Sequence, residues 1–316
     1  MILRSLSALR YGMTKRGKYR FAVRNLLALD DIDLVAQVIS TETFRRILQT
    51  TPLPIGEIKS VLVLAPHQDD ELIGAGGLCL RLRDNAIDCT IAFLTDGAER
   101  SLGKRQGGAM SVADVVKIRG EEAREVCRRL GAGYEELDIS NLDMNVGLEH
   151  VEKLSSLIER LRPSVVLSPW LLDSAPKHRV ANHLLWLACK SHSLPDFEVW
   201  GYQVNNALFA NGVLDITEHI EEKIELLKLY KSQNELLRRY DHQAWGLSAW
   251  NARYLPSKSG DSRDRYAEIF CMLPRAEFLS LVERYYTRDI PRTYLGNIEL
   301  SDAMGKLHRK LGAVGA

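Results

Sequence analysis

The sequence has no long apolar run, no paired cysteine motif and no excess of charge of either sign. None of its apolar runs approaches the roughly 20 residues that a membrane-spanning helix needs. Its five cysteines are scattered and form no CxxC pair, which argues against a disulfide framework and a thiolate metal site. The 42 Lys+Arg and 41 Asp+Glu residues nearly cancel, so no general field attracts nucleic acid. We therefore expect a soluble, cytoplasmic protein with no nucleic-acid partner.

Charge is uneven only at the N-terminus, where residues 1–29 include seven Lys and Arg and no acid. This stretch lacks the uninterrupted apolar segment of a secretory signal. A solvated arm docked on the domain surface is the favoured interpretation. A basic helix in peripheral contact with anionic lipid at the inner membrane face is the alternative.

Short apolar runs alternate with helical patterns from residue 59 to about 205, which predicts an α/β fold. We expect a Rossmann-like open, mostly parallel sheet with helices on both faces. The predicted strands are Ser60–Ala65, Cys89–Leu94, Glu135–Ile139 and Val165–Leu167, and Tyr266–Leu273 also has strand character. The predicted helices are Glu71–Arg83, Ala113–Leu130, one ending before Pro163, Val180–Cys189 and Ile220–Leu237.

The remaining segments are expected to be loops or terminal additions to one core domain. The polar, glycine-rich stretch Asp96–Ser111 is long enough to suggest a functional loop, and residues 240–264 are also predicted to be a loop. We divide the chain into an N-terminal helical extension (1–56), a core domain (57–273) and a C-terminal helical tail (274–316).

The most informative segment is Pro66-His67-Gln68-Asp69-Asp70-Glu71, directly after the first predicted strand. Ligands of open parallel sheets bind beyond the carboxyl ends of the strands. So many titratable groups are costly to bury unless a cation compensates them, and His with carboxylate suits zinc or a similar divalent ion. Of the two adjacent aspartates, one can bind a metal while the other faces its water. A plain helix start is the alternative, and it explains the acids but not the histidine.

A second segment, Ser168–Arg179, follows a later strand and places His178 at the start of a helix. Two histidines and one aspartate from these segments make a three-ligand site with an open position, the arrangement of catalytic zinc.

These segments together resemble the LmbE/PIG-L family of metal-dependent de-N-acetylases, whose hallmarks are a PHPDDE-type and an HPDH-type sequence. The resemblance extends from about residue 59 to 273, and rests on PHQDDE and on the further matches Thr95–Gly97, Arg119–Glu122, Leu130-Gly131, Asp173…Pro176–Arg179, Asp215–Thr217, Tyr230–Gln233 and Tyr266–Phe270. It implies a Rossmann-like fold, a bound zinc or other divalent ion, and hydrolysis of the N-acetyl group of an N-acetylglucosamine-type sugar.

The family pattern implies a role for each matching position. His67, Asp70 and His178 would be the metal ligands, and Asp69 the general base for a metal-bound water that attacks the amide. Glu71 would orient His67 or the loop from behind. The expected partner is an N-acetylated amino sugar within a larger conjugate, such as a lipid-linked or polysaccharide precursor.

Two departures bear on activity, because Ala175 stands where the family has its first HPDH histidine and Lys177 where it has the aspartate. That histidine is associated with oxyanion stabilisation and proton delivery, and its loss could slow the reaction on the order of 100- to 1,000-fold. Lys177 and His183 are candidates to replace it; a surface lysine and a buried histidine are the plainer interpretations. Asp96 and Arg119 are further candidate substrate contacts, although for Arg119 and Glu122 a solvated helix face is the simpler expectation.

Other interpretations stay open at this point. A degenerate, non-catalytic protein that binds metal and sugar is the main alternative, and Ala175 supports it. The Gly74-Ala-Gly76-Gly77 run with Asp96 resembles a dinucleotide fingerprint, but it lies inside the predicted helix, so close packing is the simpler explanation. Trp170 and Trp200 could stack on a sugar, with core packing favoured.

Overall fold

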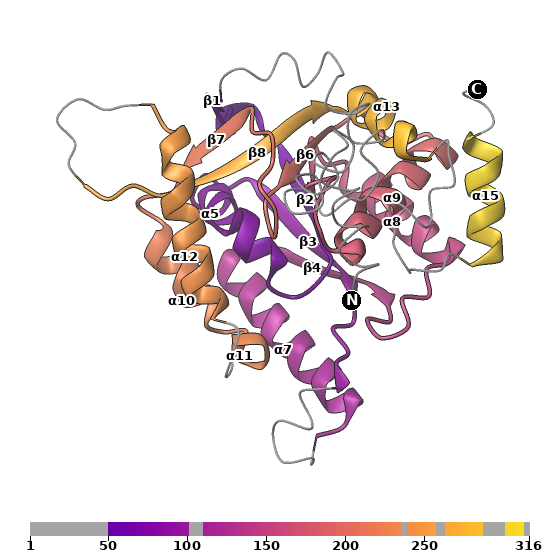
Figure 1. Ribbon diagram of the computed structural model, residues 1–316, viewed down its shortest axis with the longest axis horizontal. Coiled ribbons are helices and arrows are strands. Elements are labelled where there is room, and N and C mark those ends of the chain that lie inside the picture. Colours follow the sequence, from indigo (N-terminus) through magenta and orange to yellow (C-terminus); the bar gives the residue numbers. More distant parts are fainter. Residues whose placement is uncertain (1–49, 101–109, 235–238, 257–262, 287–300, 313–316) are drawn as a thin grey trace, which may run out of the picture.

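In the part of the chain that the structure describes, eight strands form one open sheet in the order β1-β7-β8-β6-β5-β2-β3-β4 (Figure 1). Strand β8 runs antiparallel to its neighbours β6 and β7, and the other pairs are parallel. The strands are β1 Thr51–Pro52, β2 Ser60–Ala65, β3 Asp88–Thr95, β4 Gly133–Ile139, β5 Val165–Pro169, β6 Glu198–Tyr202, β7 Gly212–Asp215 and β8 Ala267–Pro274. The predicted Rossmann-like, mostly parallel α/β fold is confirmed.

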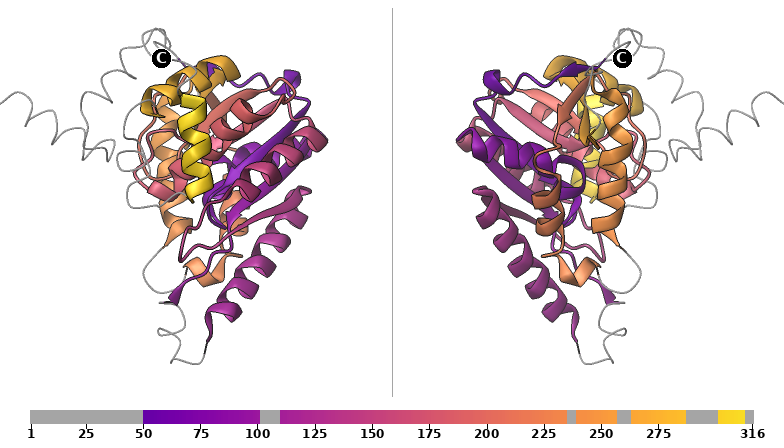
Figure 2. Two further views of the ribbon diagram at one scale, coloured as in Figure 1. Left: turned by 90° about the vertical axis from the view of Figure 1, so that its right-hand side faces the viewer. Right: turned by 90° about the vertical axis from the view of Figure 1, so that its left-hand side faces the viewer.

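Helices cover both faces of this sheet (Figures 1 and 2). In Figure 1, α5, α7, α10 and α12 lie to the left of the sheet, and α8, α9, α13 and α15 to the right. The helices are α5 Asp70–Asp84, α7 Val112–Leu130, α8 Leu148–Leu161, α9 Pro176–Ser191, α10 Ile220–Leu227, α11 Lys231–Asn234, α12 Tyr240–Asn251, α13 Arg275–Tyr286 and α15 Asp302–Gly312, with short 3₁₀ turns η1 Ile55–Glu57 and η2 Ala252–Tyr254.

Two apolar cores follow from the alternation of side chains along the strands. In β2, Leu62 and Leu64 contribute to the core under α8 and α9, whereas Val61 and Val63 contribute to the core under α5 and α7. Because both faces are buried, the central strands carry continuous apolar runs, and this is why β2 was predictable to the residue.

The order of the strands reverses between β2 and β5. From β2 the chain continues to β3 and β4 on one side, while β5 is followed by β6 on the other, and β2 and β5 pair directly. Such a reversal leaves a crevice at the carboxyl ends of the two strands, where ligands of open α/β sheets bind. The two segments singled out in the sequence follow β2 and β5, so the topology brings them together.

The glycine run of α5 is a packing device, as the simpler interpretation predicted. A Cβ at Gly74 would lie 2.3 Å from Tyr202 and 2.5 Å from the carbonyl oxygen of Gln203, and one at Gly77 would lie 2.4 Å from Ile216. Lys223 and Glu268 form a buried ion pair that is hydrogen-bonded to the backbone of α5. Lys223 Nζ donates to the Ile73 carbonyl, and Glu268 accepts from the Gly77 amide.

We expect Gly74→Ala to lower the free energy of unfolding by about 1–3 kcal/mol, because the methyl group would overpack against Tyr202. Gly246→Ala on α12 is the matched control, since a Cβ there meets nothing within 4 Å and alanine favours the helix. Urea unfolding measures both. A Gly74→Ala protein as stable as the wild type would contradict the packing role.

Two predictions for the C-terminal half are wrong. Residues 240–251 form α12 instead of a loop, and the predicted helix Ile220–Leu237 is interrupted after Leu227, with the short helix α11 following at Lys231–Asn234. Helix α12 was missed because its buried positions, Asp241, Ala244, Ser248 and Asn251, have helical spacing but carry small or polar side chains. Helix α10 ends where the Asn234 side chain donates to the Leu227 carbonyl at 2.5 Å.

The computed structural model describes residues 50–100, 110–234, 239–256, 263–286 and 301–312. The basic N-terminal stretch and most of the Asp96–Ser111 loop lie outside these ranges, and the division at residues 56 and 273 stays a prediction. No helix within the described ranges is both long and apolar enough to cross a membrane.

Candidate metal centre

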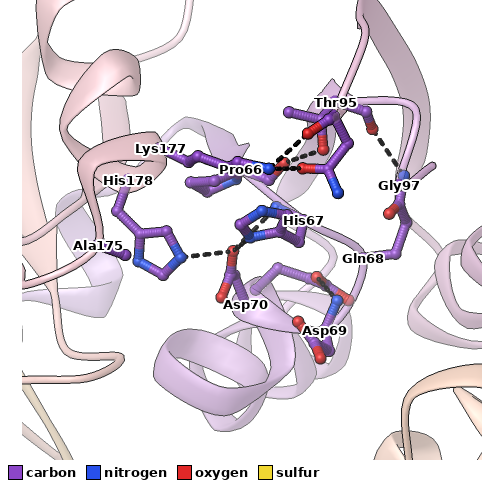
Figure 3. Close-up of polar contacts among 12 residues, drawn as sticks. Pro66, His67, Gln68, Asp69, Asp70, Thr95, Gly97, Ala175, Lys177 and His178 are labelled. Atoms are coloured by element: carbon purple, nitrogen blue, oxygen red, sulfur yellow. Dashed lines mark hydrogen bonds and ion pairs between the residues drawn. The ribbon is translucent and has the colours of Figure 1, made fainter. Parts of the chain in front are cut away.

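Three predicted ligands meet at the crevice between β2 and β5. The Asp70 carboxylate lies between two imidazoles, with Oδ2 3.1 Å from Nδ1 of His67 and 3.3 Å from Nε2 of His178 (Figure 3). The donor atoms of all three residues lie within 4.8 Å of one another. The turn after β2 supplies His67, the first residue of α5 is Asp70, and the first turn of α9 supplies His178.

The donor set fits a divalent cation of the zinc type. Zinc binds histidine nitrogen and carboxylate oxygen at 2.0–2.2 Å, so two tetrahedral ligands lie about 3.3 Å apart, close to the separations of Asp70 from each histidine. Three protein donors leave one position of a tetrahedral shell for water or substrate.

The surroundings of Asp70 and His67 hold these two groups in the protonation state that binds a cation. Burial would raise the pKa of Asp70, but the charge of His178 and the hydrogen bonds of His67 outweigh it and lower that pKa, so the carboxylate stays ionised. Burial lowers the pKa of His67 despite its neighbour Asp70, and this keeps the ring neutral. For His178, burial is outweighed by Asp70 and Asp173, and its pKa is raised.

Asp173 orients His178 from behind, and this role was not foreseen. Its Oδ1 lies 3.3 Å from Nδ1 of His178, which leaves Nε2 of the ring facing Asp70. The same carboxylate is fully buried and accepts from the backbone amides of Ala175 and Asn205. Such a carboxylate–histidine pair fixes the tautomer of a metal ligand. Only the spacing Asp173…His178 in the sequence pointed to it.

We expect Asp173→Asn to weaken zinc binding about 10- to 100-fold, because the amide cannot hold the His178 ring as the carboxylate does. Competition with a zinc-binding dye measures the affinity. Asp143→Asn, an exposed position in the loop after β4, is the control. Equal zinc affinity of the Asp173 and Asp143 variants would contradict the orienting role.

Asp69, the expected base, is buried beside the donors in an unusual backbone conformation (Figure 3). Its φ of 140° is in a region that residues other than glycine rarely adopt, at a cost of about 1–3 kcal/mol. Strain of this kind clusters at functional sites. The Asp69 carboxylate is not one of the three mutually close donors, so ligand and base candidates are separate residues.

Glu71 is wholly buried behind this turn. One of its oxygens accepts from the Asp69 amide at 3.1 Å and the other from the Tyr230 hydroxyl at 2.5 Å. Burial raises the pKa of Glu71 to about 7 against the effect of the Tyr230 hydrogen bond. Of its two expected partners, His67 and the loop that follows β2, Glu71 therefore contacts the loop.

A polar rim joins the segments beside the donors. Lys177 Nζ donates to the carbonyl and side-chain oxygens of Asn141 at 2.5 and 2.7 Å, and Asp96 Oδ1 accepts from the Asn141 amide at 2.9 Å. Lys177 is half-buried, and burial lowers its pKa. The hydrogen bonds of Lys177 and Asp96 with Asn141 were not predicted, because Asn141 belongs to no recognisable sequence motif.

Arg119 is buried, so the simpler expectation of a solvated face is wrong for it. It lies on the inner face of α7, and its guanidinium donates to the Gly97 carbonyl and pairs with Glu99, both at 2.6 Å. This arrangement holds the start of the loop after β3.

His183 and the two tryptophans do not join the site. His183 is buried and stacks on Trp186 along α9, outside the donor cluster. Trp170 and Trp200 are both at most 1% exposed, so the favoured core interpretation is confirmed. Ala175, at the place of the missing histidine, is the N-cap residue before α9 and offers no side-chain donor.

An open α/β sheet with a His-Asp-His donor set at its switch point defines a candidate metal-binding protein of Rossmann-like architecture. Comparison with known families carries this further: residues 62–189 match the model of PIG-L, described as GlcNAc-PI de-N-acetylase. Residues 62–189 therefore resemble the PIG-L (LmbE-like) family domain, and the predicted resemblance is confirmed.

Characterised proteins similar to the chain include deacetylases and a hydratase. A diacetylchitobiose deacetylase of Thermococcus kodakarensis is 28% identical over 245 residues, 70% of this chain and 85% of the relative. A 4-oxalmesaconate hydratase of Pseudomonas putida is 30% identical over 128 residues, 40% of this chain and 50% of the relative. The structure of N,N'-diacetylchitobiose deacetylase from Pyrococcus horikoshii is similar in fold, with a TM-score of 0.56 and 22% identity over 78% of this chain and 94% of that one.

Proposed function

We propose that the protein is a zinc-dependent N-deacetylase that removes the acetyl group from an N-acetylglucosamine-type sugar within a larger conjugate. The observation that carries the proposal is the His67-Asp70-His178 donor set with Asp69 beside it, inside a PIG-L domain. Similarity to a diacetylchitobiose deacetylase supports the choice of an N-acetylated sugar. A lipid-linked conjugate at the inner membrane face remains part of the proposal, based on the basic residues 1–29.

Each residue has a distinct task in this proposal. His67, Asp70 and His178 would hold the cation, which when bound lowers the pKa of a water ligand to about 7 and polarises a carbonyl oxygen. Asp69 accepts the proton of the attacking water. Lys177 offers positive charge toward the reacting amide, and Asp96 and Arg119 support the rim that receives the sugar.

Acetate release tests the proposal. Zinc-loaded protein is incubated with N-acetylglucosamine, diacetylchitobiose and a lipid-linked N-acetylglucosaminyl conjugate, and chelator-treated protein serves as the control. We expect acetate from at least one conjugate, lost with the chelator and restored by zinc. Absence of acetate from every substrate, with zinc retained, would favour the non-catalytic metal- and sugar-binding alternative.

A second candidate reaction is the addition of water to an unsaturated carboxylate. Lys177 favours it, because its ammonium group lies beside the donor set and suits an anionic substrate, and the similarity to 4-oxalmesaconate hydratase supports it. Loss of ultraviolet absorbance from a conjugated dicarboxylate, with no acetate from any amide, would select this reaction over deacetylation.

A further inference from the structure

We propose that Tyr230 is a positioning residue that acts through Glu71 to hold the backbone of Asp69 in its strained conformation. The inference rests on the proposed function, in which Asp69 is the base. It assigns a role to a tyrosine 159 positions from Glu71 in the sequence, outside the two segments that carry the metal donors.

The first step of the argument is the Asp69 backbone. A residue with a side chain leaves a φ of 140° unless neighbouring contacts hold it there. The Asp69 carbonyl accepts from the amides of Leu72 and Ile73, as at any helix start, but its own amide donates to Glu71 Oε2. The helix therefore fixes the Asp69 carbonyl group, and the contact with Glu71 fixes the Asp69 amide group.

The second step is that Glu71 itself needs to be held. Its carboxylate is 0% exposed, and within the described ranges no lysine or arginine forms an ion pair with it. The Tyr230 hydroxyl, also wholly buried, donates to Oε1 at 2.5 Å, a short hydrogen bond. Because neither group is exposed to solvent, the phenol fixes the direction of the carboxylate.

The third step is that the turn carrying Tyr230 is anchored independently. Tyr230 lies between α10 and α11, and two residues later Ser232 donates through its amide and hydroxyl to Glu122 on α7, at 3.0 and 2.6 Å. One turn thus contacts α5 through Tyr230 and α7 through Ser232. Loss of the Ser232 hydroxyl loosens the same turn without touching Glu71, which makes Ser232→Ala the matched control.

The test compares Tyr230→Phe with Ser232→Ala in the full-length, zinc-loaded protein. Phenylalanine keeps the packing and removes the single hydrogen bond to Glu71. We expect kcat for acetate release to fall about 10- to 100-fold in Tyr230→Phe, with KM and zinc affinity within about twofold, because displacement of a catalytic group by about 1 Å has effects of this size. Ser232→Ala should keep kcat within about threefold. Equal kcat values for the two variants would overturn the proposal.

A double variant and an activity-independent readout complete the test. Tyr230→Phe combined with Glu71→Gln should be no slower than Glu71→Gln alone, since both act through one contact; additive losses would contradict this. Amide hydrogen exchange of the peptide containing Asp69 should quicken about 10-fold in Tyr230→Phe and stay unchanged in Ser232→Ala. Unchanged exchange in Tyr230→Phe would overturn the inference, whereas quickened exchange in a protein that releases no acetate would overturn only the proposed function.

Discussion

Replacement of His178 by alanine is expected to remove tight zinc binding and to lower acetate release at least about 1,000-fold. The imidazole is one of three donors, and its Nε2 lies 3.3 Å from the shared Asp70 oxygen. Loss of a residue that hydrogen-bonds to a zinc ligand already lowers zinc affinity about 10- to 100-fold. Loss of the ligand itself should lower zinc affinity further. Loss of the cation also removes the stabilisation of the oxyanion, where even one donor is worth 100- to 1,000-fold. Zinc content after dialysis and the acetate rate measure the two effects.

His192→Ala is the control for this prediction. His192 is the C-cap residue after the same helix and lies near Glu152, and it takes no part in the donor cluster. It should keep both zinc and rate, and circular dichroism should show both variants folded. A folded His178→Ala protein with wild-type zinc content would contradict the assignment of the ligands.

Asp69→Asn is expected to lower kcat about 100- to 10,000-fold while zinc is retained, because an amide cannot accept the proton that a carboxylate can. Asparagine is nearly the same size as aspartate and is among the residues most often found at positive φ, so the turn should survive the change. The comparison with Asp70→Asn separates the neighbouring acids. Asp70→Asn should lose zinc affinity as well as rate, since Asp70 Oδ2 contacts both histidines.

The measurements for this pair are zinc titration and steady-state kinetics. Wild-type kcat in Asp69→Asn would exclude Asp69 as the base. Loss of zinc from Asp69→Asn and not from Asp70→Asn would show that the two roles are reversed.

The central sheet and the donor set could be predicted because their causes are local in the sequence. Strand β2 is buried on both faces and carries a continuous apolar run, and its end leads directly into His67 and Asp70. The end of β5 leads in the same way toward His178, and parallel strands place such ends at one edge. Two motifs and one topological rule were therefore enough to bring the two segments together, whereas the choice of Asp70 over Asp69 as the ligand came from the family resemblance.

The supporting contacts could not be predicted, since they depend on where distant side chains come together. Tyr230 reaches Glu71 across 159 positions, and Lys177 reaches Asn141 across 36. Arginine is usually a surface residue, yet Arg119 lies on the inner face of α7 and donates to the Gly97 carbonyl. Helix α12 was missed for a related reason, because its buried face consists of small and polar residues that carry no apolar period.

The most direct test of the account is a crystal structure of the zinc-soaked protein, with anomalous diffraction recorded on both sides of the zinc absorption edge. The account predicts one peak within about 2.2 Å of His67 Nδ1, Asp70 Oδ2 and His178 Nε2, with the Asp69 carboxylate outside that shell. A zinc peak elsewhere, or none at these residues in a folded protein, would contradict it.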